Sequence, residues 1–146
     1  MIKNTLEVMK KLSDEGLIKD ISISVFKNNQ IINDFNKFDN KKHFHIFSAG
    51  KPFIAAVIWK LHDKKILNFN DPIIKYWPEF GKNYKNNIKI KDVLTHTSGV
   101  SKANDLMDND YIDLNRVSRW LENYNPESKP GSRIAYHEVT FGWILG

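Results

Sequence analysis

The chain has 146 residues, of which 41% are hydrophobic and 27% charged, a composition typical of one folded domain rather than of a disordered, collagenous or coiled-coil chain. Its net charge is +5, but the basic residues are scattered lysines with only Arg116, Arg119 and Arg133 among them, which favours a solvated surface over a nucleic-acid interface. The chain has no cysteine, which excludes disulfides, thiolate metal sites and a cysteine nucleophile.

Two segments bear on the subcellular location of the protein. Residues 1–14 hold no apolar stretch of the roughly 7 to 15 residues that a secretory signal needs. The longest apolar run, residues 53–59, is far shorter than the ~20 residues that cross a bilayer. We therefore expect a cytoplasmic protein that does not interact with a membrane.

The N-terminal part predicts a helix over residues 5–15. Asn4 and Glu7 have the spacing of a helix-capping pair, and apolar residues then recur on one face of the helix. Gly16 can end the helix because glycine adopts the left-handed conformation found after helix C-termini.

A β-hairpin is predicted next. Residues 21–25 alternate between apolar and polar side chains in the strand period, and residues 31–35 can return as a second strand. Asn28 and Asn29 between them supply turn chemistry. Residues 42–47 predict a further extended segment.

A long apolar helix is predicted to follow. Residues 53–61 place apolar side chains on almost every face, so we expect the helix to be buried nearly all round. Pro52 has no amide hydrogen to bind the Ser48 carbonyl, which predicts that the helix begins near Ser48.

The rest of the chain carries shorter helix signals that rest on caps, prolines and glycines. The predicted segments are a turn with Asp71 as N-cap and Pro72 at its first position, ended by Pro78; a helix over 90–95, stopped at Gly99; a helix capped by Asp113 and reaching Tyr124; and a helical stripe from Val139 to Gly146. The fold class is thus α/β (α+β), with a sheet so small that either helices dominate or further strands are required.

Two Ser-x-x-Lys patterns could each build an activated nucleophile, because residues three apart share one face of a helix. Ser24 and Lys27 fall in a predicted strand, where this spacing puts side chains on opposite faces. Ser48 and Lys51 fall instead at the start of the apolar helix, where the helix dipole favours a developing oxyanion and apolar neighbours favour a neutral amine. Taken alone, these residues favour a serine cap beside a solvated lysine.

Four segments in order resemble the serine β-lactamase and penicillin-binding-protein superfamily, especially its class C branch and the related esterases. The resemblance covers about residues 17–146. The segments are Phe47 to Phe53 (FSAGKPF), the pair Lys65 to Pro72 (KILNFNDP) and Tyr76 to Phe80 (YWPEF), Asp92 to Val100 (DVLTHTSGV), and Pro130 to His137 (PGSRIAYH).

The resemblance implies a β-lactamase/transpeptidase-like fold and acyl transfer without a cofactor. By it, Ser48 is the nucleophile, Lys51 the general base and Tyr136 the hydroxyl that relays a proton to the leaving group. The implied substrate is a small ester or amide. Its position after a Pro-Gly turn, taken alone, favours a packing role for Tyr136.

The chain departs from the family pattern at two places. β-Lactam-hydrolysing members carry asparagine two residues after the tyrosine, whereas here the residue is Glu138, which favours an esterase-like activity. The Lys-Thr-Gly or His-x-Gly strand of the family has no counterpart before Gly146. We therefore expect residues 1–146 to be the N-terminal part of such a domain, divided into 1–47 and 48–146, weakly active or inactive alone, with a complementing C-terminal chain as a partner.

Other interpretations stay open at this stage. His43 and His45 could join His62 or His96 in a metal site, although no helical Asp/Glu-His spacing accompanies them. His96 and Ser98 fit a helix-terminating turn better than a second nucleophile. The acids Glu79, Asp105, Asp108 and Asp110 fit surface charges. From a different functional class, the chain could be a non-catalytic β-lactamase-like remnant or binding module.

Overall fold

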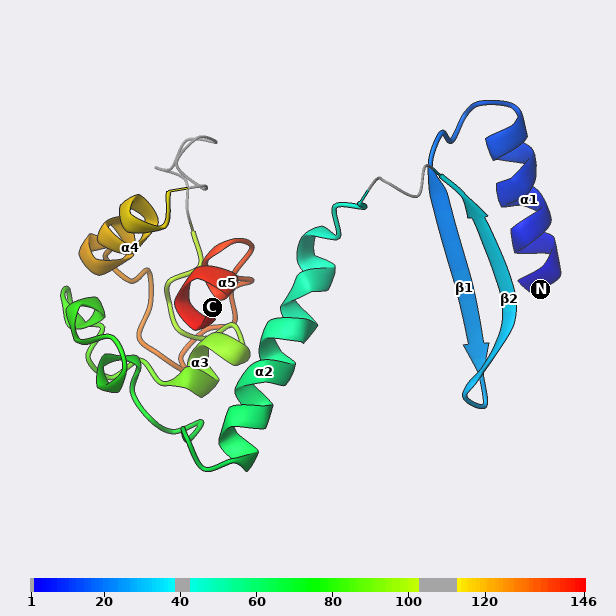
Figure 1. The fold of residues 1–146 in the computed structure, drawn as a ribbon. Helices are drawn as coiled ribbons and strands as arrows, with labels where there is room; N and C mark the ends of the chain where they lie inside the picture. Colours follow the sequence, from blue (N-terminus) through cyan, green and yellow to red (C-terminus); the bar gives the residue numbers. More distant parts are fainter. Residues whose placement is uncertain (1, 39–42, 103–112) are drawn as a thin grey trace. The chain divides into compact units, whose positions relative to one another are not determined.

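The computed structural model describes residues 2–38, 43–102 and 113–146, and it divides the chain into two units, Met1–His45 and Ile46–Gly146 (Figure 1). The first unit carries a hairpin beside a helix, and the second is helical. This mixture of helices with a small two-stranded sheet agrees with the predicted α/β (α+β) class.

The first unit consists of helix α1 (Ile2–Asp14) and the antiparallel strands β1 (Ile21–Lys27) and β2 (Gln30–Lys37). Asn28 and Asn29 form the predicted turn with φ of 53° and 59°, as a tight hairpin with right-handed strand twist requires. Gly16 follows the helix with φ 74°, as predicted. Lys37 ties β2 to the end of α1 by donating to the Ser13 carbonyl at 3.1 Å.

Two predictions for this unit are wrong. The helix begins at Ile2, so Asn4 lies inside it rather than at its N-cap, because each added helical residue gains a backbone hydrogen bond that outweighs one side-chain cap. The predicted extended segment 42–47 forms no strand over residues 43–46, and Lys42 lies outside the described residues. Phe47 instead begins a 3₁₀ turn.

The second unit starts with the 3₁₀ turn η1 (Phe47–Gly50), which leads directly into helix α2 (Lys51–Asp63). The later elements are short: η2 (Ile73–Lys75), η3 (Pro78–Gly81), α3 (Ile90–Leu94), α4 (Leu114–Asn123) and α5 (Thr140–Leu145). Asp113 caps α4 as predicted, accepting from the amides of Asn115 and Arg116. Over the described ranges, no helix combines the length and apolar character needed to cross a bilayer.

The predicted environment of α2 is also wrong. Its apolar residues do not lie in an all-round core, since Ile58 is its only buried residue. Phe53, Val57 and Trp59 are 69%, 59% and 61% exposed. Periodicity cannot separate a helix enclosed by neighbours from one that packs on a single side, as α2 does here against α5.

Asp71 does not act as the predicted N-cap. The residue before η2 is Pro72, which is extended and receives no side-chain cap. The Asp71 carboxylate instead accepts from the Asn68 amide at 2.8 Å, Lys75 at 2.9 Å and the Tyr76 hydroxyl at 2.6 Å. These bonds lower the pKa of Asp71 to about 2, with Lys75 the largest cause.

The core of the second unit gathers where α3, α4 and α5 meet the chain around η3. Its fully buried apolar residues are Phe80, Ile88, Val93, Val100, Val117 and Leu121. Thr140 joins the start of α5 to this core by donating to the Val100 carbonyl at 2.6 Å. The segment that precedes α5 is thereby fixed against the turn that follows α3.

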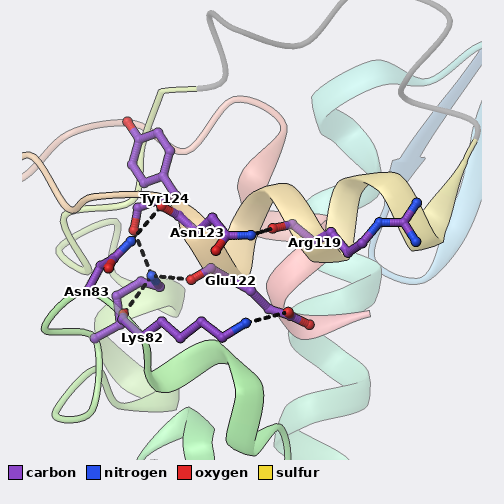
Figure 2. Close-up of polar contacts among 7 residues, drawn as sticks. Lys82, Asn83, Arg119, Glu122, Asn123 and Tyr124 are labelled. Atoms are coloured by element: carbon purple, nitrogen blue, oxygen red, sulfur yellow. Dashed lines mark hydrogen bonds and ion pairs between the residues drawn. The ribbon is translucent and has the colours of Figure 1, made fainter.

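A buried lysine fastens the end of α4 to the loop after η3. Lys85 is 0% exposed, and its ammonium donates to the carbonyls of Lys82, Glu122 and Tyr124 at 2.8, 3.0 and 2.6 Å. Burial lowers the pKa of Lys85 to about 8. Figure 2 shows the neighbouring contacts, in which Lys82 pairs with Glu122 at 3.3 Å and Asn83 donates to the Asn123 carbonyl.

Replacing Lys85 should destabilise the second unit strongly. The change Lys85→Met leaves three carbonyls without this donor, and we expect it to lower the free energy of unfolding by about 2–4 kcal/mol. Lys82→Met removes only a surface ion pair and should cost less than about 0.5 kcal/mol. Urea unfolding followed by tryptophan fluorescence measures both, because all four tryptophans lie in this unit. Equal midpoints for the two variants would contradict this role of Lys85.

Candidate active site

Ser48 lies exposed in the tight turn at the head of α2. The residue before it, Phe47, has φ 46°, a left-handed conformation that costs energy for a non-glycine residue and that clusters at functional sites. The Ser48 carbonyl accepts from the Lys51 amide in the 3₁₀ turn that leads into α2, which agrees with the predicted helix start near Ser48. The geometry presents the Ser48 hydroxyl to solvent at the positive end of the helix dipole.

The Lys51 side chain connects Ser48 to a distant part of the chain. Its Nζ lies 3.1 Å from Ser48 Oγ and donates to the main-chain carbonyl of Glu138 at 2.6 Å. The second contact joins residues 87 positions apart in the sequence. The amine is therefore held in one place beside the hydroxyl instead of moving freely in solvent.

Tyr136 completes this cluster. Its ring centroid lies 4.8 Å from Lys51 Nζ, and its side chain is 53% exposed. Hydrogen bonding with Ser48, and secondarily with Lys51, lowers the pKa of the Tyr136 phenol. The structure thus brings the three predicted site residues together, two from the head of α2 and one from the segment before α5.

The segment that carries Tyr136 is anchored to the turn after α3. The Ala135 amide donates to the His96 carbonyl at 2.9 Å, and the His137 amide donates to His96 Nδ1 at 3.1 Å. Sequence reasoning missed this contribution of His96. Its only signal was its place in the His-Thr-Ser-Gly segment, which does not reveal a partner forty residues away.

Ser98 forms a buried pair with His137, the residue that follows Tyr136. Both are 0% exposed, and their Oγ and Nε2 atoms lie 2.5 Å apart. Burial lowers the pKa of His137, which favours the neutral imidazole. A hydroxyl with no exposed surface cannot meet a substrate carbonyl, so Ser98 supports the turn. The left-handed φ of His96 and Gly99, 59° and 79°, confirms the predicted turn.

The second Ser-x-x-Lys pattern has a different environment. Ser24 and Lys27 both lie in β1, as predicted. The Ser24 hydroxyl donates to the Asp34 carboxylate across the hairpin at 2.9 Å. The Ser24 hydroxyl proton is therefore engaged in a surface hydrogen bond with a carboxylate. Ser24 can serve as a control for Ser48, because it has the same sequence pattern in a different environment.

The metal-site alternative finds no support among the described residues, where no group of three histidines or carboxylates is placed to hold an ion. The His62 ring stacks on the Phe69 ring, with ring centroids 3.9 Å apart. His96 takes part in the contacts with Ala135 and His137 described above. Glu79 is an exposed residue of η3. The remaining acids considered for acid/base roles, Asp105, Asp108 and Asp110, lie outside the described residues.

The arrangement has the parts needed for nucleophilic catalysis. An exposed hydroxyl stands at hydrogen-bond distance from an amine that can take its proton, and a phenol with a lowered pKa lies beside both. Such a group can attack a carbonyl, and the phenol can pass a proton to the departing group. No metal ligand is needed for this chemistry.

Comparison with known proteins shows the family of the chain. A family model described as Beta-lactamase matches residues 7–146. The esterase/beta-lactamase LipL of Mycobacterium tuberculosis is 34% identical over 100 residues, which make up 68% of this chain and 23% of LipL. The chain therefore spans about a quarter of the length of that relative.

Solved structures share the fold. A penicillin-binding protein homolog from Caulobacter crescentus is 30% identical, with a TM-score of 0.64 over 68% of this chain and 27% of that one. A class C beta-lactamase, at 19% identity, has a TM-score of 0.74 over 98% of this chain and 42% of its own. Together with the family model, which matches nearly the whole sequence, these similarities show that the chain belongs to the beta-lactamase family of serine hydrolases and esterases.

Proposed function

We propose that this chain carries the nucleophilic site of a serine hydrolase that cleaves a small ester or amide through an acyl-enzyme on Ser48. The observation that carries the proposal is the 3.1 Å approach of Lys51 Nζ to Ser48 Oγ, with Lys51 fixed by the Glu138 carbonyl. A fixed amine can act as a general base because it stays within reach of the proton it removes.

In the proposed reaction, Ser48 Oγ attacks the substrate carbonyl while its proton passes to the Lys51 amine. The oxyanion that forms is favoured by the dipole of α2. Tyr136 then gives its phenol proton to the leaving group, for which a phenol with a lowered pKa is a better donor, and takes up the proton held by Lys51, so that both groups return to their starting states. Water finally attacks the acyl-enzyme and releases the acid.

Turnover by the complete enzyme is proposed to need further structure. The family resemblance assigns a second oxyanion donor to a Lys-Thr-Gly or His-x-Gly strand, and the chain spans about a quarter of LipL. We infer that a complementing segment or chain supplies that strand. The isolated 146 residues should then form the acyl-enzyme slowly and release it poorly.

The substrate is proposed to be a neutral ester rather than a β-lactam. The name of LipL includes both activities, so family membership alone does not decide between them. The exposed Glu138 lies near enough to act electrostatically on Tyr136, opposing the lowering of its pKa. A carboxylate at this place repels the carboxylate that β-lactam antibiotics carry.

The first test is covalent labelling of Ser48. Incubation with p-nitrophenyl butyrate followed by peptide mass spectrometry should show one butyryl group on Ser48 and none in Ser48→Ala. Lys51→Met should slow labelling by 10²-fold or more, because general-base assistance contributes about 10²–10⁴-fold. Ser24→Ala is the matched control and should label like the native chain. Labelling that is absent, or that ignores Ser48 and Lys51, would favour the alternative of a non-catalytic binding module.

The second test concerns selectivity at Glu138. Two unit charges about 4 Å apart in water interact by about 1 kcal/mol, so Glu138→Gln should raise acylation by a fluorescent penicillin about fivefold relative to the neutral ester. Glu138→Asn also removes the charge, and it introduces the asparagine that β-lactam-hydrolysing members of the family carry at this position. Equal gains in both variants indicate charge repulsion, and a gain in Asn alone indicates amide binding. No gain in either would contradict the role of Glu138 in substrate choice.

A further inference from the structure

The position of Tyr136 depends on one residue outside the three proposed to react. Tyr136 is more than half exposed, so packing of its own ring does not fix it. The residues on either side of it both donate their amides to His96, Ala135 to the carbonyl and His137 to Nδ1. The His96 ring also lies against the Tyr136 ring, with centroids 4.8 Å apart.

His96 is itself firmly held. Its amide donates to the Val93 carbonyl at 3.0 Å at the end of α3, and Val93 is fully buried in the core. The left-handed φ of 59° turns the chain so that the His96 carbonyl meets Ala135. A non-glycine residue accepts this conformation only where surrounding contacts impose it. His96 therefore holds residues 135–137 in a fixed position relative to the core.

The contacts of His96 also fix its protonation. Because the His137 amide donates to Nδ1, this nitrogen must carry a lone pair, and the neutral ring holds its proton on Nε2. Protonation would place a hydrogen on Nδ1 facing the His137 N–H, and the hydrogen bond would be lost. The new charge would also repel Lys51.

Lys51 is the charged group that acts on His96, and it opposes that charge. α2 contributes Lys51, the segment before α5 contributes Tyr136 and the neutral His137, and α5 contributes the uncharged Phe141, whose ring centroid lies 5.3 Å away. None of these supplies a carboxylate. Burial, and then Lys51, accordingly lower the pKa of His96.

We propose that His96 is a positioning residue for Tyr136: its neutral ring and its carbonyl hold the 135–137 segment so that the phenol stays beside Lys51 and Ser48, and its protonation releases that segment. The catalytic part of this inference rests on the proposed function. The structural part does not, since it concerns the geometry of Tyr136 whether or not Ser48 reacts.

The direction of the pH effect follows from the neutral form being the active one. A histidine whose pKa is lowered stays neutral until the pH falls below its ordinary value of about 6.5. Release of Tyr136 should therefore lower the acylation rate by up to about tenfold for each pH unit once the pH falls below the lowered pKa of His96, in addition to any decline that a chain without this histidine shows over the same range.

Two substitutions separate this role from simple packing. His96→Asn keeps an acceptor oxygen near the position of Nδ1, tolerates a left-handed φ and does not titrate. It should acylate Ser48 within about threefold of the native rate at neutral pH and should lack the additional decline at acidic pH. His96→Ala removes the acceptor and the ring, and should lower the maximal acylation rate by about 10- to 100-fold at unchanged half-saturating ester concentration.

Nuclear magnetic resonance of the native chain tests the inference without any reaction. The ¹⁵N shifts of His96 should show protonated Nε2 and bare Nδ1, and the Tyr136 ring resonances should move with the His96 titration midpoint, a shift absent in His96→Asn. A proton on Nδ1, or Tyr136 resonances that ignore this titration, would overturn the proposal even if His96→Ala does not fold. Failure of Ser48 to acylate with these signals intact would overturn the proposed function and leave the positioning role standing.

Discussion

The site depends on one hydrogen bond between distant parts of the chain, from Lys51 Nζ to the Glu138 carbonyl at 2.6 Å. A lysine at the head of a helix normally extends into solvent, since its ammonium is strongly hydrated. Here a main-chain acceptor from the segment before α5 holds it over the Tyr136 ring and beside Ser48. The three groups become a site only because this bond exists.

The core determines where that acceptor lies. Thr140 and the buried Ser98–His137 pair attach the start of α5 to the turn after α3. Gly99 lets the same turn approach the 126–131 loop, because a Cβ there would lie 2.2 Å from the Ser128 carbonyl oxygen. The turn after α3 is thus the fixed reference against which the Tyr136 segment is placed, and a disturbance there should alter reactivity without touching a reacting atom.

Local chemistry explains what the sequence predicted correctly. The Ser48–Lys51 spacing and Pro52 specify a turn whose geometry involves only neighbouring residues, and the Asn28–Asn29 hairpin and the Asp113 cap are equally local. Tyr136 was identified only through family resemblance, because its own neighbours fit a packing residue. The Glu138 carbonyl and His96 were missed, since every residue has a carbonyl and contacts between residues 39 to 87 positions apart produce no periodic pattern in the sequence. The burial of α2 was overestimated for a related reason, as the pattern shows which residues are apolar and not what covers them.

The proposed chemistry requires that Ser48, Lys51 and Tyr136 share one hydrogen-bonded cluster in solution. Titration of the ¹³Cζ resonance of Tyr136 tests this requirement most directly. We expect a Tyr136 pKa below the ordinary tyrosine value of about 10 in the native chain, and a return toward that value in Lys51→Met. A Tyr136 that titrates near 10 in the native chain, with no response to the loss of Lys51, would contradict it.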